Sequence, residues 1–285
     1  GQCQSARRSV SVEWMIAASP PTDQRARALG VLRMSLTARC NLACPYCCPD
    51  AADPPGVLSL EEQLRLIRVA ANLGAHTLRL TGGEPLLSER LLPLLERVAM
   101  GRRTSGDPLQ GLRQVALTTN GVLLTQERAK ALRSVGLERI TVSLDAVEGA
   151  VVARMAGLRG GGRAGDRLVG QVLAGLAAAR SAGFDPAEGA LKLNAVIQRG
   201  VNDDQLIPLA ELARQHRLEL RLIEYMDVGN RNGWAMEQVL PAAVMIDRIH
   251  RHWPLSPLGR SSGATARRWR YRDGLASIGV IASIS

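Results

Sequence analysis

Two spacings of apolar residues alternate along the chain. Short extended runs, rich in Val, Ile, Leu and Thr, are separated by longer stretches in which apolar residues recur at helical intervals. Strands and helices in this order favour an α/β fold around a parallel sheet. The short runs predict six strands, over Val31–Thr37, His76–Thr81, Gln114–Thr119, Arg139–Leu144, Leu191–Ile197 and Glu219–Ile223. The longer stretches predict helices near 59–74, 91–100, 125–136, 168–182 and 202–216.

Six strand–helix units are too few to close an eight-stranded barrel. We therefore expect a partial (β/α)6 TIM-like barrel that stays open, with its functional residues at the carboxyl ends of the strands. Two helix starts carry their own signals. Ser59 and Glu62 form a capping-box pattern, and Asn202 is expected to cap the helix that ends at His216.

The segment before this core has a different composition. Arg7-Arg8 and the stretch Ser9–Ala18 are weakly similar to a twin-arginine export signal, but Glu13 interrupts the apolar residues and the chain has no initiator Met. We interpret residues 1–24 as a flexible leader. No run of about 18 apolar residues occurs anywhere, so we expect no membrane-spanning helix.

After a core over 25–240, residues 241–285 read as the start of a C-terminal region. A helix is predicted at 242–252, followed by a loop rich in Pro, Gly and Ser. A hairpin then joins Arg268–Tyr271 to Leu275–Ile281.

The charge of the chain is strongly basic. The net charge is +10, and all of the 36 basic residues except Lys130 and Lys192 are arginines. They are scattered along helical segments, and only 3% of the residues are aromatic, so the interleaving typical of nucleic-acid interfaces is lacking. The pattern favours a solvated arginine-rich surface first, an anionic small substrate second and nucleic acid third. We predict no nucleic-acid partner.

Four of the five cysteines lie between Cys40 and Cys48, where disulfides would close very short loops and add little stability. Cys40, Cys44 and Cys47 have the spacing C-x3-C-x2-C, which favours an iron–sulfur cluster in a reducing cytoplasm. Three thiolates leave one iron of a cubane without a protein ligand. A zinc site is the alternative, but Cys48 is badly oriented as a fourth ligand and no His lies between Cys40 and His76.

Polar clusters follow the predicted strands. Thr81-Gly82-Gly83-Glu84-Pro85 follows the second strand, where paired glycines allow close backbone approach and the carboxylate can receive an ammonium group. Further clusters end the third, fourth and sixth strands, at Thr118–Gly121, Ser143–Asp145 and Glu224–Asp227.

Three cations lie inside apolar strands. Lys192 is flanked by Leu191 and Leu193, and Arg33 and Arg79 occupy similar positions. A buried cation needs an anion, and the triphosphate of a substrate would serve; exposure of one or two of the three is left open. A G-x-G-x-x-G pattern at 160–165 lacks the preceding strand of a dinucleotide site and is interpreted as a flexible loop.

The cysteine loop, with the aromatic Tyr46 directly before the third cysteine, resembles the signature of the radical S-adenosylmethionine superfamily. The resemblance implies that Cys40, Cys44 and Cys47 hold a [4Fe–4S] cluster whose open iron is chelated by S-adenosylmethionine. It also implies reductive cleavage of that cofactor to a 5′-deoxyadenosyl radical, which abstracts hydrogen from a substrate.

From about Arg25 onward the chain resembles one branch, the molybdenum cofactor biosynthesis protein A family of GTP 3′,8-cyclases. The resemblance implies a cytoplasmic lyase that uses an electron donor and converts GTP to (8S)-3′,8-cyclo-7,8-dihydroguanosine 5′-triphosphate, the first step towards molybdopterin. The implied contacts are Tyr46, Gly83, Ser143 and Met226 for S-adenosylmethionine, and Arg33, Arg79, Thr118 and Lys192 for GTP. The matching stretches are Leu32–Cys47, Arg79–Leu86, Leu117–Leu124, Thr141–Asp145, Leu191–Asn202 and Arg221–Trp234.

The chain departs from this family at three places. Ala38 stands where the family often has Asp, and Cys48 stands where Met or Leu is expected. The family also continues past the segment matching Ile278–Ser285 into a second three-cysteine cluster motif, whose ligands are absent here. The chain is then a fragment, a natural truncation or a paralogue. Two other functions stay open, a radical enzyme with another substrate and a non-catalytic remnant. The oligomeric state is also open, a homodimer included.

Overall fold

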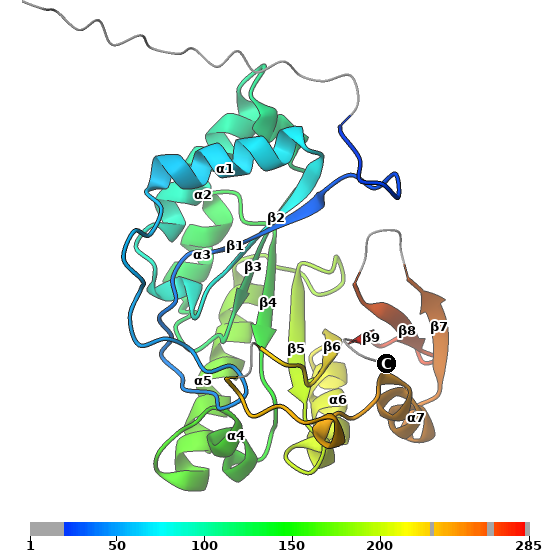
Figure 1. Cartoon of the computed structure of the whole chain (residues 1–285). Coiled ribbons are helices and arrows are strands. Elements are labelled where there is room, and N and C mark those ends of the chain that lie inside the picture. Colours follow the sequence, from blue (N-terminus) through cyan, green and yellow to red (C-terminus); the bar gives the residue numbers. More distant parts are fainter. Residues whose placement is uncertain (1–19, 229–230, 261–264, 283–285) are drawn as a thin grey trace, which may run out of the picture.

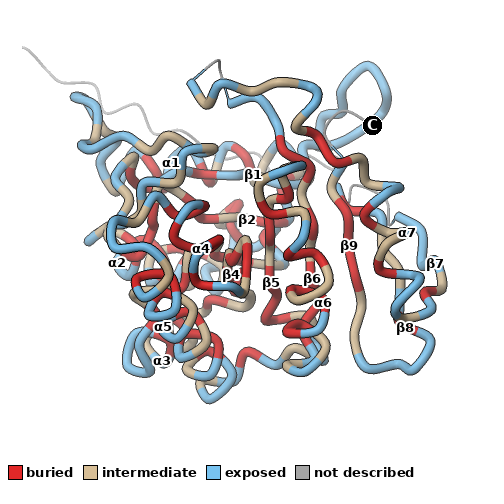
Figure 2. Tube along the Cα trace, turned by 90° about the horizontal axis from the view of Figure 1, so that it is seen from below, coloured by how far each residue is buried: buried red, intermediate tan, exposed pale blue. Residues whose placement is uncertain are grey.

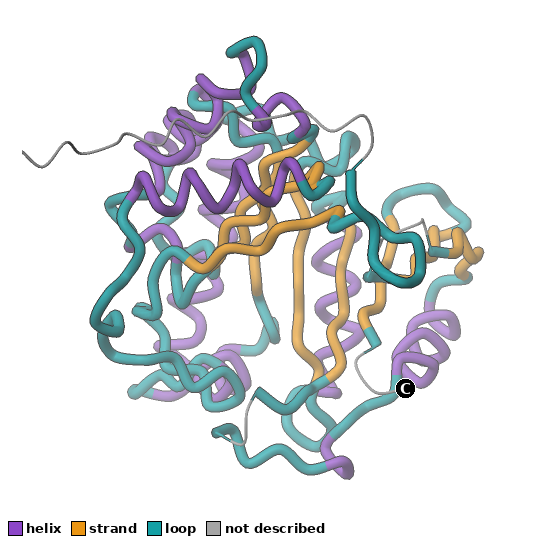
Figure 3. Tube along the Cα trace, turned by 45° about the horizontal axis from the view of Figure 1, so that its top comes forward, coloured by secondary structure: helices purple, strands orange, loops and turns teal. Residues whose placement is uncertain are grey.

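The computed structural model describes residues 20–228, 231–260 and 265–282. The predicted leader therefore lies mostly outside the described residues. One curved sheet runs through the molecule, and Figure 3 shows its strands bordered by the helices. Its nine strands are ordered β1-β2-β3-β4-β5-β6-β9-β8-β7.

The first six strands are parallel and succeed one another across the sheet. Every predicted strand of the core is confirmed to within two residues. They are β1 (Gly30–Ser35), β2 (Ala75–Thr81), β3 (Gln114–Thr119), β4 (Arg139–Ser143), β5 (Leu191–Ile197) and β6 (Glu219–Glu224). Because β1 and β7 are not paired with each other, the sheet stays open, as expected for a partial barrel.

The C-terminal hairpin extends the same sheet. Strand β9 (Ser277–Ile281) pairs parallel to β6 and antiparallel to β8 (Arg267–Tyr271), which confirms the predicted hairpin. Strand β7 (Leu255–Gly259) pairs with β8, although its Pro257 and Gly259 indicated a loop. Proline is tolerated there because β7 is an edge strand. The division at 240/241 stays a prediction.

The helices border the sheet (Figure 1), and most begin within three residues of their predicted positions. The capping box of Ser59 and Glu62 is present at the first helix. The helices are α1 (Leu60–Asn72), α2 (Leu91–Arg103), α3 (Gln126–Ser134), α4 (Gly149–Met155), α5 (Gly161–Ser181), α6 (Leu206–Gln215) and α7 (Ala242–His252).

The prediction of a flexible loop at 160–165 is wrong, because α5 begins at Gly161. The preceding helix, α4, was also not predicted. The two helices pack so closely that a Cβ on Gly165 would collide with the backbone of Gly149. Glycine normally weakens a helix, but here its lack of a side chain permits this contact, and packing outweighs propensity.

The core lies between the sheet and the helices. Neighbouring residues of a strand face opposite sides, so Leu78 and Leu80 of β2 are fully buried while Arg79 between them lies on the other face. Figure 2 shows buried segments concentrated in the strands and the inward sides of the helices. With few aromatic residues, the core consists mainly of Leu, Val, Ile and Ala.

Candidate functional site

The three-cysteine loop leaves the carboxyl end of β1. Its turn is tight, because the backbone amides of Cys47 and Cys48 both donate to the carbonyl oxygen of Cys44, each at 3.0 Å. The Sγ atom of Cys40 accepts from the backbone amide of Leu42 (3.4 Å) and from Nδ2 of Asn120 (3.8 Å). All four cysteines of the loop are free thiols.

Cys48 is engaged differently from the other three cysteines. Its thiol donates to the carbonyl oxygens of Pro45 (3.0 Å) and Arg231 (3.3 Å), and its φ of 48° is unusual for a residue with a side chain. These contacts agree with the expectation that Cys48 is a poor fourth ligand.

The thiols of the loop lie within electrostatic reach of one another. Burial raises the pKa of Cys44 to about 12, and the charges of Asp145, Cys47 and Cys40 act in the same direction. Burial and the charge of Cys40 also raise the pKa of Cys47. Because thiolates are the ligand form, a bound cation that offsets their mutual repulsion fits this loop. Among the described residues, no three His, Cys, Asp or Glu side chains form a group for one metal ion.

Gly82 and Gly83 bring the end of β2 against the chain that leads into the loop. The amide of Gly83 donates to the carbonyl oxygen of Thr37 (2.7 Å), and the amide of Glu84 donates to that of Arg39 (2.8 Å). A Cβ on Gly83 would collide with the carbonyl oxygens of Ala38 and Arg39. The paired glycines are thus needed for backbone packing directly before Cys40.

The carboxylate of Glu84 is already hydrogen-bonded within the protein, whereas we expected it to receive an ammonium group. It is fully buried and accepts from the hydroxyl of Thr119 (2.7 Å), the amide of Leu86 (3.0 Å) and the amide of Asn120 (2.8 Å). These bonds join the ends of β2 and β3. The side chain of Asn120 is thereby held beside Cys40 and also donates to Oδ1 of Asn41 (2.8 Å).

Asp53 supports the same loop and was missed by sequence analysis. Its Oδ1 accepts from the hydroxyl of Thr37 (2.7 Å) and the amide of Ala38 (2.6 Å), and its Oδ2 accepts from Nε of Arg39 (3.2 Å). The hydrogen bond from Thr37 is foremost among the causes that lower the pKa of Asp53. No local pattern marks this residue, since its partners lie far back in the sequence.

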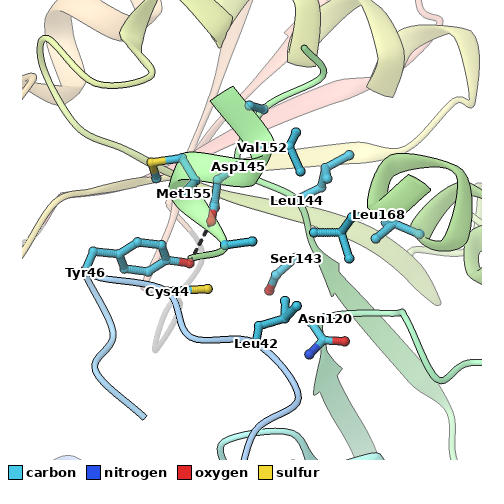
Figure 4. Close-up of a pocket in the computed structure, with 13 residues that line it drawn as sticks. Leu42, Cys44, Tyr46, Asn120, Ser143, Leu144, Asp145, Val152, Met155 and Leu168 are labelled. Atoms are coloured by element: carbon cyan, nitrogen blue, oxygen red, sulfur yellow. Dashed lines mark hydrogen bonds between the residues drawn. The ribbon is translucent and has the colours of Figure 1, made fainter. Parts of the chain in front are cut away.

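The predicted S-adenosylmethionine contacts surround the loop. Figure 4 shows Tyr46 and Ser143 in one pocket, which Cys44, Asn120 and Asp145 also line. Burial raises the pKa of Asp145 to about 6. Gly83 packs against the chain segment that leads into the loop.

Met226 is exposed, and its backbone is linked to the loop. Nδ2 of Asn232 donates to the carbonyl oxygens of both Tyr46 (3.1 Å) and Met226 (3.0 Å). The segment after β6 thus meets the loop after β1.

The Asn202 prediction needs correction. Asn202 precedes a short 3-10 turn and makes no cap bond to the following helix. Its fully buried side chain donates instead to the carbonyl oxygens of Asp145 (2.7 Å) and Val196 (2.8 Å), and it accepts from the amide of Gln198 (2.7 Å). It therefore joins the ends of β4 and β5.

Cations occupy one face of the sheet. Arg33 of β1 is the register partner of Arg79 of β2. The predicted GTP contacts Thr118 and Lys192 both pair with Thr141 of β4, which lies between them. Arg33 is exposed on the edge strand β1, an outcome that the sequence left open for one or two of the three cations. Burial lowers the pKa of Arg79, and the charges of Arg221 and Arg33 lower it further.

Lys192 already has an anion, which sequence analysis did not identify. The residue is 7% exposed, and its Nζ donates to Oε1 of Glu219 at 3.1 Å. Glu219 also accepts from Nε of Arg221 (2.8 Å) and from a guanidinium nitrogen of Arg268 (2.8 Å). Burial and then the charge of Arg221 lower the pKa of Lys192 to about 8.

Arg139 belongs to the same cationic group. Burial and the charges of Arg79 and Arg221 lower the pKa of Arg139 to about 10. Among the described residues, the buried Nε atoms of Arg139 and Arg268 have no hydrogen-bond partner. The signal that could have found these cations is strand register, since Arg79 and Arg139 both pair with Ala116, and Arg221 and Arg268 both pair with Gly279.

Comparisons with known proteins agree on the family. The pattern of the Radical SAM superfamily matches residues 34–213, and that of Molybdenum Cofactor Synthesis C matches residues 218–285. The GTP 3′,8-cyclase of Synechococcus sp. (strain WH7803) is 69% identical over 95% of this chain and 78% of its own length. That of Xanthomonas campestris pv. campestris (strain B100) is 43% identical over 95% of this chain and 76% of its own length.

A solved structure shares the fold. Streptococcus suis SuiB bound to S-adenosylmethionine superposes with a TM-score of 0.57 at 15% identity, covering 79% of this chain and 47% of that protein. No helix in the described part of the chain has the length and apolar character needed to cross a membrane.

Proposed function

The chain belongs to the radical S-adenosylmethionine superfamily and, within it, to the GTP 3′,8-cyclase family, and on this premise we propose that it cyclises GTP. The product is (8S)-3′,8-cyclo-7,8-dihydroguanosine 5′-triphosphate, and the pathway is molybdenum cofactor synthesis. The cationic face of the sheet supports this proposal, because it offers a polyanion several arginines and Lys192 around one carboxylate.

Cys40, Cys44 and Cys47 hold the [4Fe–4S] cluster in this proposal. When bound, the cluster supplies the electron that cleaves S-adenosylmethionine to methionine and the 5′-deoxyadenosyl radical. The residues around the loop orient that cofactor, with Tyr46, Gly83, Ser143 and Met226 as its contacts. An electron donor is required, and a reducing cytoplasm keeps the thiols available.

In this proposal the substrate lies against the cationic face of the sheet. Arg33, Arg79, Thr118 and Lys192 bind GTP, with the cations directed to its phosphates. Arg139 and Arg268 have unpaired Nε–H groups, which suits further phosphate contacts. Held in this way, the ribose faces the carboxyl ends of the strands, where the radical forms. Hydrogen abstraction from C3′ would let the carbon radical attack guanine C8, and one further electron from the electron donor, together with a proton, would complete the 7,8-dihydro product.

Anaerobic reconstitution tests the proposal. We expect about four irons per chain for one cubane, 5′-deoxyadenosine on addition of a reductant, and a GTP-dependent cyclic product. Nucleotide affinity should fall from GTP to GDP to GMP, because each lost phosphate removes charge that the cations bind. Cleavage that is indifferent to GTP would favour another substrate, and a chain that binds no cluster would favour a non-catalytic role.

A further inference from the structure

One hydrogen bond ties the three-cysteine loop to the opposite side of the site. The hydroxyl of Tyr46 donates to Oδ2 of Asp145 at 2.7 Å, across 99 residues of sequence. Figure 4 shows the bond crossing the space between the loop and the end of β4. Since Tyr46 lies between Cys44 and Cys47, this bond acts on the part of the loop that carries two of the three predicted cluster ligands.

Asp145 is itself held in a rigid frame. Its other carboxylate oxygen, Oδ1, accepts from the backbone amide of Val196 in β5 at 2.8 Å. Its carbonyl oxygen accepts from Nδ2 of Asn202, which also donates to the carbonyl oxygen of Val196. Asn202 is fully buried, and Asp145 is half-buried where it lines the pocket. The carboxylate is therefore a fixed point at the ends of β4 and β5.

Two further hydrogen bonds hold the backbone at the two sides of this part of the loop. The amide of Ala43 donates to the carbonyl oxygen of Ala156 (3.1 Å), and the carbonyl oxygen of Tyr46 accepts from Asn232 (3.1 Å). The Tyr46 hydroxyl adds a hydrogen bond from a side chain of the loop to Asp145 at the end of β4. A hydroxyl that donates to a carboxylate makes a charge-assisted bond, which is stronger than a neutral one.

We propose that Asp145 is a positioning residue that, through the Tyr46 hydroxyl, fixes the three-cysteine loop over the ends of β4 and β5. This inference rests on the proposed function. Ser143, a predicted contact of S-adenosylmethionine, is two residues from Asp145 on the same strand end. The bond therefore sets the distance between the cofactor atoms held at the loop and those held at the strands. Misplacement by roughly 1 Å can cost about 100-fold in rate.

Three variants test this role, namely Tyr46→Phe, Asp145→Asn and the double variant. Tyr46→Phe keeps the ring and removes only the hydroxyl. We expect it to retain the wild-type iron content while its kcat for reductive cleavage of S-adenosylmethionine, measured without GTP, falls about tenfold. The KM for S-adenosylmethionine should change much less. The electron paramagnetic resonance spectrum of the reduced cluster should differ from wild type only when S-adenosylmethionine is present.

Asp145→Asn distinguishes the hydrogen bond between Tyr46 and Asp145 from a general effect of the negative charge of the carboxylate. Its single amide oxygen can still accept from Val196, and its NH2 group can donate to the Tyr46 hydroxyl, so we expect partial rescue relative to Tyr46→Phe. If the two residues act through one bond, the double variant should be no slower than Tyr46→Phe alone. Additive losses would overturn the proposal.

Tyr271→Phe is the matched control. Tyr271 is buried in β8, and its hydroxyl has no hydrogen-bond partner among the described residues. This variant should behave as wild type. An unchanged kcat in Tyr46→Phe would overturn the proposal, and so would loss of iron from that variant, since the bond would then serve cluster retention. If the wild-type chain itself cleaves no S-adenosylmethionine, the proposed function fails and the inference falls with it.

Discussion

Burial governs the ionisation of the thiols at the scale of single residues. Burial first, and then the charges of Asp145 and the neighbouring thiols, raises the pKa of Cys44 to about 12. A thiol in this state binds metal only by losing its proton, so a cluster bound as proposed would have to supply the free energy that keeps the loop ionised. Cys48 lies beside the same loop, but its thiol bonds to two carbonyl oxygens.

The first prediction separates these two cysteines. Cys44→Ser should abolish the cluster, whereas Cys48→Ser should retain it, because a serine hydroxyl at position 48 can still donate to a backbone carbonyl. Iron and sulfide per chain after anaerobic reconstitution provide the measurement. Full iron in Cys44→Ser would show that the ligand assignment is wrong.

The second prediction uses the two lysines of the chain. Lys192→Ala should weaken GTP binding by about 10- to 100-fold, because a hydrogen bond to a charged group contributes roughly 1.5–3 kcal/mol. Lys130→Ala, an exposed position on α3, is the control and should bind GTP as wild type. Calorimetry on the cluster-loaded protein measures both. Equal affinities would return Lys192 to a structural role.

At the scale of elements, the end of β2 supports the loop that follows β1. The two segments are joined by hydrogen bonds from Gly83 and Glu84, and Asp53 closes the other side by binding the amide of Ala38. Ala38 is the position at which the resembling family often carries Asp. Asp53 accepts a hydrogen bond from the amide of Ala38 and forms an ion pair with Arg39. Arg39 therefore has an acidic partner even though position 38 is alanine.

The third prediction compares two glycines. Gly83→Ala places a Cβ into the carbonyl oxygens of Ala38 and Arg39, so we expect a loss of about 1–3 kcal/mol in the free energy of unfolding and weaker iron retention. Gly170→Ala adds its Cβ in open space on α5 and should stabilise the protein by roughly 0.5–1 kcal/mol. Urea titration of both variants checks the opposite signs. Destabilisation of similar size in both would contradict the packing argument.

At the scale of the whole molecule, one carboxylate joins the two halves that match different family patterns. Glu219 binds Lys192 in the first half and Arg221 and Arg268 in the second. Burial alone would raise the pKa of Glu219, but these three cations outweigh it and lower the pKa to about 2. Without the carboxylate, three cations would face one another across β5, β6 and β8.

The fourth prediction concerns this network and pH. Glu219→Gln should lower the free energy of unfolding by about 3–5 kcal/mol at neutral pH, as expected when one partner of a buried pair is removed. Because the folded-state pKa of Glu219 is depressed, its contribution is present above the unfolded value near 4.5 and is lost as pH falls towards 2. The difference between variant and wild type should therefore shrink over that range.

Glu211→Gln, an exposed position on α6, provides the control, because no contact of this carboxylate contributes to the network. It should follow the wild-type unfolding curve at every pH. A difference between Glu219→Gln and wild type that stays constant from neutral pH down to the acid limit would contradict the assigned pKa shift.

Local patterns determined much of this protein. The six core strands, the hairpin and the cysteine spacing follow from apolar periodicity, turn residues and distances of a few residues along the chain. The strand-end clusters could also be predicted, because parallel strands bring their carboxyl ends to one edge. The rule does not require knowledge of which side chains meet there.

Only the tertiary structure decided which partners these residues have. Lys192 pairs with Glu219, Glu84 binds the end of β3, and Tyr46 reaches Asp145, because each pairing depends on strand register and on contacts between distant segments. The helix that begins at Gly161 also depends on tertiary contacts, because its glycines have low helix propensity and the helix is stabilised by packing against α4. Sequence periodicity specifies the face on which a residue lies, while burial and register specify what it binds.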